Sequence, residues 1–360
     1  MTKRILVFLL VITLSVTMLA ACGGNNGNNE ATTNNEGTNN AAETEESSDS
    51  GEGKKVGVLF YKYNDPYISI VRRNLQETAE ADGSITLIEQ DGQDNQGMQN
   101  DQIDTVISQG VDVLLVNIVD TGAASAAIDK AKAADLPIIF FNREPENDDV
   151  YSTYEKSRFV GTKIEEAGEL QGDMIAELWN KDTAKYDRNG NGKLDYVLLH
   201  GGIDNAEAVA RSKYSVENAK KAGIEVNEIG MQIAKWDAEA AKNAMDAWLA
   251  KSIDDIDVVI ANNDSMAIGA INSLKANGFN SGDDSKHILV FGVDALEEAQ
   301  KLIEEGAMSG TVKQDGEAMA KALFDLAKNA AEGKDFLDGT DYEYDDSGVA
   351  VRIPYQRFEK

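Results

Sequence analysis

The strongest chemical signal in this chain lies in a nine-residue loop, DRNGNGKLD, at 187–195. Side chains that carry oxygen fall at positions 1, 3, 5 and 9 of the loop: Asp187, Asn189, Asn191 and Asp195. With glycine at position 6 and the backbone carbonyl of Lys193 at position 7, this spacing matches the first nine positions of an EF-hand calcium loop. The acid expected at position 12 is absent, because Leu198 stands there. The sequence therefore predicts a structural Ca²⁺ site whose last carboxylate comes from elsewhere in the chain, and the alternative is a metal-free turn rich in Asn and Gly.

A second group of polar side chains stands where apolar, strand-like segments end. Its members are Asp65, Asn117, Asn142, Asn263, Asp264, Asp294 and Gln314. Ligands of open α/β sheets bind at the carboxyl ends of the strands. Small-molecule sites are also common between domains. We therefore expect these side chains to line a cleft between two lobes.

The elements that must position these residues follow one rhythm. Strands are predicted at 54–61, 84–90, 111–119, 137–142, 196–201, 224–231, 256–262, 288–294 and 310–314. Amphipathic helices are predicted between them, among others at 68–81, 98–110, 205–222, 237–251, 265–277 and 296–305. Such alternation is typical of βαβ units with helices on both faces of a parallel sheet. VDVLLVN at 111–117 and IDVVIAN at 256–262 echo each other, so we predict an α/β protein with two similar doubly wound lobes.

The net charge and the few His and Cys residues argue against several classes of function. The chain has 360 residues and a formal net charge of −29, which repels nucleic acid. Its only histidines are His200 and His287, and its only cysteine is Cys22. The chain therefore has too few His and Cys residues for a zinc site of these ligands, and one cysteine cannot form an internal disulfide. Two histidines also make a Ser-His-Asp triad a poor candidate.

The N-terminus predicts an address outside the cytoplasm. Lys3 and Arg4 precede an apolar run at 5–19, and the run ends in Leu-Ala-Ala-Cys at 19–22. This ending resembles a bacterial lipoprotein signal, in which 1–21 is removed and Cys22 is lipidated; the alternative is an ordinary signal peptide with a chance cysteine. Residues 23–53 contain no aromatic residue, Leu, Ile or Val, so we predict a disordered acidic tether at 22–53. We expect the protein to be held at the cell membrane by its lipid.

The body of the chain resembles a known family. Its marks are VGVLFYKYNDPY, NDQIDTVISQGVDVLLVNIVD, FFNREP, DRNGNGKLDYVLLHG, WDAEAAKNAMDAWL, VVIANNDSMAIGA, VFGVDAL and FDLAKNAAEGK. Over nearly all of 55–355 the chain is similar to the galactose/glucose-binding proteins of sugar ABC transporters, within the ribose-type periplasmic substrate-binding proteins. The resemblance implies two lobes joined by a three-segment hinge near 135–137, 315–317 and 351–353. The implied first lobe is 54–135 plus 316–351, and the second is 136–315 plus 352–360.

The resemblance also implies sugar contacts. Tyr67 and Trp236 match aromatic residues that stack on the two faces of the sugar ring. Asp65, Asn263, Asp294 and Gln314 match positions that bind sugar hydroxyl groups. Arg211 matches the Arg that reaches the ring oxygen and the anomeric side, and Asn117 matches the Asn at the end of its strand. For calcium, Asp257 stands where the family supplies a remote Glu, one methylene longer.

Three residues depart from the family pattern. Asn205 and Glu207 stand where His and Asp are expected ahead of the Arg, and Gln314 stands in place of Asn. The first two positions face the anomeric and exocyclic end of the sugar. A pyranose is expected, while the choice between galactose, glucose and another aldose stays open.

The implied function is binding without catalysis. The protein would bind a monosaccharide as a monomer and deliver it to an ABC transporter permease. Alternatives are a sugar sensor for a chemoreceptor or sensor kinase, and a binding protein for another aldose such as xylose or arabinose. A glycoside hydrolase with Asp65 and Asp294 as its paired carboxylates is the remaining alternative.

Overall fold

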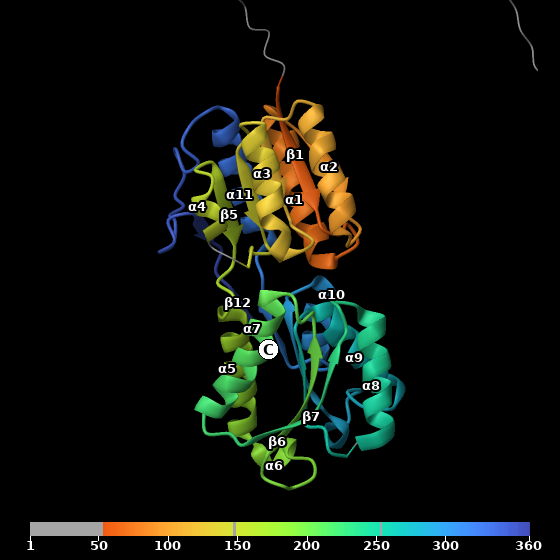
Figure 1. Cartoon of the computed structure of the whole chain (residues 1–360). Coiled ribbons are helices and arrows are strands. Elements are labelled where there is room, and N and C mark those ends of the chain that lie inside the picture. The colour runs from red at the N-terminus through yellow and green to blue at the C-terminus, as the bar shows by residue number, and fades with distance from the viewer. Residues whose placement is uncertain (1–52, 147–148, 253) are drawn as a thin grey trace, which may run out of the picture. The chain divides into compact units, whose positions relative to one another are not determined.

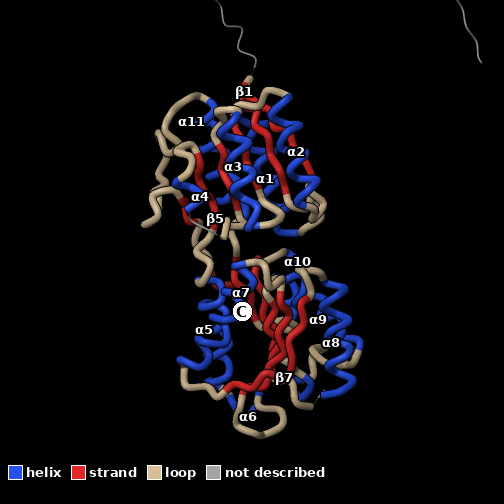
Figure 2. Tube along the Cα trace, in the orientation of Figure 1, coloured by secondary structure: helices blue, strands red, loops and turns tan. Residues whose placement is uncertain are grey.

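Two six-stranded sheets with helices on both faces make up the part of the chain that the structure describes (Figures 1 and 2). The structure is a computed structural model that describes residues 53–146, 149–252 and 254–360. The predicted signal peptide, Cys22 and the tether up to residue 52 lie outside the described residues. No helix in the described ranges combines the length and the apolar character needed to cross a membrane.

The first sheet has the strand order β11-β5-β4-β3-β1-β2, and all its pairs are parallel. Its strands are β1 (Lys54–Phe60), β2 (Ile85–Asp91), β3 (Val113–Val116), β4 (Ile138–Phe141), β5 (Ser157–Gly161) and β11 (Ala350–Arg352). The helices of this half are α1 (Pro66–Asp82), α2 (Gln96–Ser108), η1 (Thr121–Ala123), α3 (Ala124–Ala133), α4 (Asp149–Ser152) and α11 (Gly316–Ala331). One face of the sheet packs against α1 and α11, and the other against α2 and α3.

The second sheet has the strand order β12-β10-β9-β8-β6-β7. Its strands are β6 (Leu194–His200), β7 (Val226–Ile233), β8 (Val258–Ala261), β9 (Leu289–Asp294), β10 (Gly310–Lys313) and β12 (Gln356–Glu359). Its helices are α5 (Glu166–Lys181), α6 (Thr183–Tyr186), α7 (Ala206–Lys221), α8 (Ala238–Ser252), α9 (Asp264–Ala276), η2 (Asp284–Lys286) and α10 (Glu297–Glu305). One face packs against α8, α9 and α10, and the other against α5 and α7.

The predicted fold class is confirmed. The two sheets share one topology, because the order β2-β1-β3-β4-β5 of the first sheet corresponds to β7-β6-β8-β9-β10 of the second. The segments that echo each other in the sequence form β3 and β8, which hold the same place in their sheets. A late strand completes each sheet, and β12 differs from the rest because it pairs antiparallel with β10.

The predicted first crossing near 135–137 is wrong. Strand β4 pairs with β3, and β5 pairs with β4, so the stretch 136–161 belongs to the first lobe rather than the second. The chain first passes to the second sheet between β5 and α5, at 162–165. It returns between β10 and α11, at 314–315, and passes over again between β11 and β12, at 353–355. Arg352, predicted in the second lobe, is the last residue of β11 in the first sheet.

Candidate functional site

A polar cavity lies where carboxyl ends of strands from both sheets meet. Its lining residues are Tyr61, Asp65, Tyr67, Ile68, Asn142, Arg143, Asn205, Glu207, Arg211, Trp236, Asn263, Asp294 and Gln314. The cavity volume is about 40 Å³, enough for a few waters. The structure thus brings together nine of the ten predicted sugar contacts, and Asn117 is not among the lining residues.

Three of these side chains are also helix N-caps. The Oδ1 atoms of Asp65, Asn205 and Asn263 accept the backbone N–H groups at the starts of α1, α7 and α9, at 2.9, 2.9 and 3.0 Å. A short polar residue after a strand is favoured at this position because it satisfies an otherwise unpaired N–H group of the first turn. One residue therefore both begins the helix and turns a polar group toward the cavity.

Asn117 has a different task. Its side chain is fully buried, accepts the N–H of Tyr61 at 3.3 Å, and donates to the carbonyl of Phe141 at 3.1 Å. Asn262, at the matching place after β8, likewise accepts the N–H of Gly201 at 2.9 Å. Both asparagines thus tie neighbouring strand ends together. Asn117 reaches the cavity only through Asn142, whose Oδ1 accepts its amide at 3.2 Å.

Both aromatic residues predicted to stack on the sugar ring line the cavity. Tyr67 is buried on α1, and Trp236 lies in the loop between β7 and α8. The indole of Trp236 packs directly on Gly201, where a Cβ atom would come within 2.3 Å of the ring. Gly201 is therefore required for this position of the indole.

Backbone strain is concentrated at the same cavity. Asn142, Trp236 and Asp294 have φ values of +61°, +64° and +125°, although none of them is glycine. Such conformations cost on the order of 1–3 kcal/mol each and persist mainly where function maintains them. Their presence in one cavity supports its assignment as the functional site.

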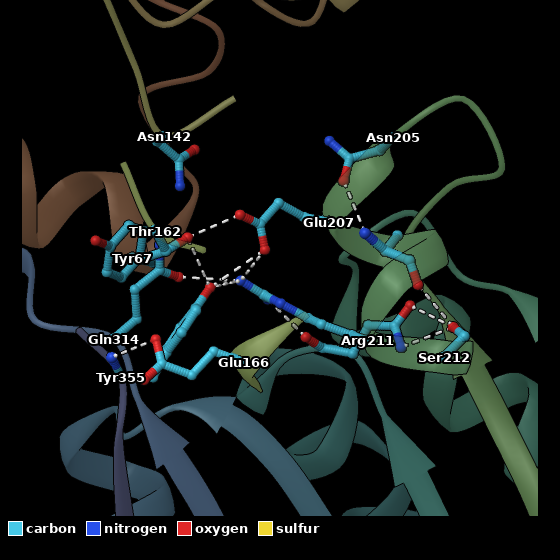
Figure 3. A network of polar contacts seen from close by, with 12 residues as sticks. Tyr67, Asn142, Thr162, Glu166, Asn205, Glu207, Arg211, Ser212, Gln314 and Tyr355 are labelled. Carbon is cyan, nitrogen blue, oxygen red and sulfur yellow. Dashed lines mark hydrogen bonds and ion pairs between the residues drawn. The ribbon is translucent and has the colours of Figure 1, made fainter. Parts of the chain in front are cut away.

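Arg211 and Glu207 form the charged centre of the site (Figure 3). Both project from α7, and their closest charged atoms are 3.4 Å apart. Arg211 donates to the carbonyl of Asn262 at 2.8 Å, to Oε1 of Gln314 at 3.2 Å and to the hydroxyl of Tyr355 at 2.8 Å. Burial alone would lower the pKa of Arg211, but Tyr355, Glu207 and Asp294 raise it, so the guanidinium stays charged.

Two buried donors of this centre have no partner among the described residues. They are Nε of Arg211 and Nε2 of Gln314. A buried donor without a hydrogen bond costs about 1–3 kcal/mol. The cavity is therefore built to hold an occupant that accepts hydrogen bonds at these two places.

Asp294 lines the cavity, and the carboxyl group of Asp264 is its neighbour. Asp264 itself is not among the lining residues, although its position at a strand end predicted that it would be. Burial raises the pKa of Asp294 well above its usual range, and the neighbouring charge of Asp264 adds to the effect. Burial raises the pKa of Asp264 to about 7, although hydrogen bonds from Thr311 at 2.6 Å and Leu296 at 2.8 Å favour its charged form. The pair therefore retains a proton at pH values where an exposed aspartate has lost it.

This pair predicts a measurable pH dependence of stability. Because the folded-state pKa of Asp264 lies above its unfolded value, its protonation stabilises the fold at low pH, and this contribution is lost as pH rises through about 7. Asp264→Asn removes the titrating proton: its oxygen can still accept the N–H of Leu296, while its amide nitrogen would donate to the hydroxyl of Thr311. Its free energy of unfolding should therefore fall less steeply between pH 4 and 7. Each pH unit of pKa displacement is worth about 1.4 kcal/mol. Urea unfolding across this pH range measures the slope, and the exposed Asp129→Asn is the control.

A native slope retained by Asp264→Asn would contradict this assignment of the proton. Asp294 also takes part in the pair, so the slope should shrink rather than vanish.

Four lining residues were not predicted as contacts. Tyr61 donates its hydroxyl to Oδ2 of Asp65 at 2.5 Å, and Arg143 stacks on the Tyr61 ring at 4.0 Å. Asn142 and Ile68 complete the set. Asn142 was expected to line the cleft because it ends the predicted strand at 137–142, although it was not among the predicted sugar contacts. Arg143 follows it directly in the motif FFNREP, so its position after that strand was the signal that could have identified it.

The six predicted calcium ligands occur in one small region of the second sheet, where β6 and β8 begin. Asp187 accepts backbone N–H groups from Asn191 and Gly192, while Asp195 accepts the side-chain amides of Asn189 at 2.8 Å and Asn191 at 2.7 Å. Asp195 and Asp257 are almost fully buried.

Asp257 closes this loop from a distant part of the sequence. Its carboxylate accepts the backbone N–H groups of Arg188 and Asp195, each at 2.9 Å. Burial, together with the neighbouring charges of Asp195 and Asp187, raises its pKa to about 6 although these hydrogen bonds act in the opposite direction. In the described ranges, no three acidic, His or Cys side chains form a metal site by themselves, so amide and carbonyl oxygens would have to complete one. The donor set is therefore of the all-oxygen kind that calcium prefers.

Known proteins are similar to this chain in sequence and in fold. Residues 56–335 match the family model described as a periplasmic binding protein domain. The chain is 40% identical over 315 residues to the D-galactose/methyl-galactoside binding periplasmic protein MglB of Haemophilus influenzae, covering 87% of this chain and 92% of that protein. It is 30% identical to a putative rhizopine-binding protein of Rhizobium meliloti, covering 80% and 87%.

A solved structure agrees with these relatives. An ABC transporter solute binding protein from Bacillus halodurans, crystallised with myo-inositol, superposes with a TM-score of 0.71 at 26% identity and covers 86% of this chain and 96% of that one. The names of all three relatives describe binding and none describes catalysis. The predicted resemblance is confirmed, and this chain belongs to the periplasmic binding protein family, whose members bind solutes outside the cytoplasm rather than act as enzymes.

Proposed function

We propose that this protein binds one monosaccharide, galactose or glucose, in the cavity and delivers it to the permease of an ABC transporter. The observation that supports this most directly is the composition of the cavity. Two aromatic side chains, Tyr67 and Trp236, offer surface for the weakly apolar faces of a sugar ring. Around them stand carboxylates, amides and a guanidinium that can each pair with hydroxyl groups, and hydrogen bonds to ionised partners are the stronger ones.

The polar donors left without partners add to this proposal. Nε of Arg211 and Nε2 of Gln314 need acceptors, and sugar hydroxyl and ring oxygens can supply them. Asn205, Glu207 and Gln314 distinguish this cavity from the pattern of the galactose/glucose proteins, so xylose or arabinose remains the alternative ligand. A role as a sugar sensor for a chemoreceptor or sensor kinase would use the same cavity and differ only in the partner.

Isothermal titration with glucose, galactose, xylose, arabinose and ribose tests the proposal. We expect one binding site per chain for at least one of them. Trp236→Ala should weaken binding of that sugar about tenfold, because stacked aromatic surface is worth on the order of 1.5 kcal/mol. Trp248→Ala is the control, since Trp248 packs on Gly230 away from the cavity.

The absence of heat with all five sugars would refute an aldose receptor. Hydrolysis of a chromogenic glycoside, lost in Asp294→Asn, would instead support the glycosidase alternative.

We also propose that the loop at 187–195 holds a structural Ca²⁺. Side-chain oxygens of Asp187, Asn189, Asn191 and Asp195, the carbonyl of Lys193 and the carboxylate of Asp257 would bind it. The support is the burial of the carboxyl groups of Asp195 and Asp257, where a cation would offset negative charge. A half-turn of each asparagine amide would present its oxygen in place of its nitrogen. The metal would brace this loop in a protein that has no disulfide.

The proposed anchoring completes this function. A lipid on Cys22 would keep the binding protein at the membrane, and the acidic segment 22–53 would tether it there. Tethering raises the effective concentration of a binding module near its partner. Because the chain is strongly negative, it repels nucleic acid and anionic lipid surfaces, so neither is the proposed partner.

A further inference from the structure

The charged centre of the cavity is hydrogen-bonded to residues that do not line the cavity. Glu207 uses both of its carboxylate oxygens in this way. Oε1 accepts the hydroxyl of Thr162 at 2.7 Å, and Oε2 accepts the hydroxyl of Tyr355 at 3.2 Å. Tyr355 also accepts from Arg211 at 2.8 Å, so one hydroxyl joins both charged residues (Figure 3).

These two partners and a third, Gln314 from the cavity lining, lie on three different crossings between the two sheets. Thr162 follows β5 directly, on the first crossing. Gln314, which accepts from Arg211, follows β10 on the second, and Tyr355 precedes β12 on the third. The charged pair on α7 is therefore bonded to all three segments that connect the two halves of the described chain.

The hydrogen bonds among Glu207, Arg211 and these three partners are buried. Thr162 is fully buried, and Gln314 and Tyr355 are each only 4% exposed. Water cannot easily replace a lost hydrogen bond there, and a buried charge without its partners is costly. Burial raises the pKa of Tyr355, and Glu207 adds to the rise while Arg211 opposes it, so the hydroxyl keeps its proton and can donate to Glu207.

We propose that Tyr355 is a positioning residue of the binding site, and that Thr162 assists it from the first crossing. Its hydroxyl holds Arg211 and Glu207 in the orientation that meets the ligand, and thereby couples ligand binding to the geometry of the three crossings. This inference rests on the proposed sugar-binding function. Ligand contacts that need Arg211 and Glu207 in place are then sensitive to any shift of the crossings, and the crossings are sensitive to the ligand.

The experiment compares Tyr355→Phe with Tyr196→Phe. Each substitution removes one hydroxyl that bonds a carboxylate, but Tyr196 bonds Glu228 at 3.0 Å in the second sheet and does not line the cavity. With D-galactose and D-glucose as probes, Tyr355→Phe should weaken binding of the bound sugar about tenfold, through faster dissociation. Tyr196→Phe should leave both affinity and dissociation rate within about twofold of the native values. Thr162→Val should act in the same direction as Tyr355→Phe, and Thr162→Ser should restore what valine loses.

Equal dissociation rates in native protein and Tyr355→Phe would overturn the inference while leaving the proposed function intact. Binding of neither probe by the native protein would instead refute the galactose/glucose proposal. In that case a double-mutant cycle of Tyr355→Phe and Glu207→Gln on sugar-free unfolding decides the inference. Non-additive effects support the link between the two residues, and additive effects overturn it.

Discussion

Arg211→Ala is expected to lower the free energy of unfolding by about 3–5 kcal/mol and to weaken sugar binding about a hundredfold or more. The side chain is only 4% exposed, and its charge lies 3.4 Å from that of Glu207 and opposes the rise in the pKa of Asp294. Removing one partner of a buried charged group costs more than the pair itself is worth, because the remaining charge is left without compensation. The lost affinity comes from the guanidinium Nε, which is free for a ligand.

Two variants on the same residue and helix sharpen this test. Arg211→Lys keeps the charge but not the planar fork that reaches Asn262, Gln314 and Tyr355 together, so it should recover part of the stability and less of the affinity. Lys213→Ala, an exposed position two residues along α7, should change stability by no more than about 0.5 kcal/mol. Urea unfolding and titration calorimetry measure both quantities. Native affinity in Arg211→Ala would show that the guanidinium serves structure alone.

Calcium is expected to raise the melting temperature by roughly 8 °C when its free concentration is about a thousand times its Kd. At that excess, a ligand that binds only the folded state adds about 4 kcal/mol to the free energy of unfolding. Differential scanning calorimetry in calcium and in chelator measures the difference. A melting temperature that is the same in both would contradict the proposed metal site.

Asp257→Asn tests the proposed metal site at one of its predicted ligands. Without calcium, Asp257 is a buried carboxylate whose pKa is raised to about 6 by burial and by the charges of Asp195 and Asp187. The neutral amide removes this buried charge, but its single oxygen can accept only one of the N–H groups of Arg188 and Asp195. In chelator at pH 8 the variant should therefore lose part of the native stability. In calcium it should lose more, because it also lacks a ligand charge. Asp255→Asn, an exposed carboxylate two residues earlier, should follow the native protein in both conditions.

The sequence by itself carried most of the fold. Buried parallel strands read as continuous apolar runs, and the helices between them are amphipathic, so local patterns predicted nine of the twelve strands in the described chain. The strands β5, β11 and β12 and the helices α5 and α11 were not predicted. The same patterns located the polar residues at strand ends. Since parallel strands end on one side of their sheet, local information was enough to predict that Asp65, Asn263 and Asp294 contribute to one cavity.

Only the tertiary structure decided which sheet each strand joins and where buried hydrogen bonds go. The resemblance placed the first crossing before β4, and the apolar run of β4 reads the same in either sheet. Only its pairing with β3, a non-local choice, showed that this crossing was misplaced. Asn117 carries the same strand-end signal as the lining residues, yet its amide is consumed by neighbouring strand ends. Tyr355 and Thr162 gave no local signal, because their role depends on hydroxyl contacts with Glu207, 148 and 45 residues away along the chain. A hydrogen bond needs partners within about 3 Å in space, and a sequence records their types and order but not which of them meet.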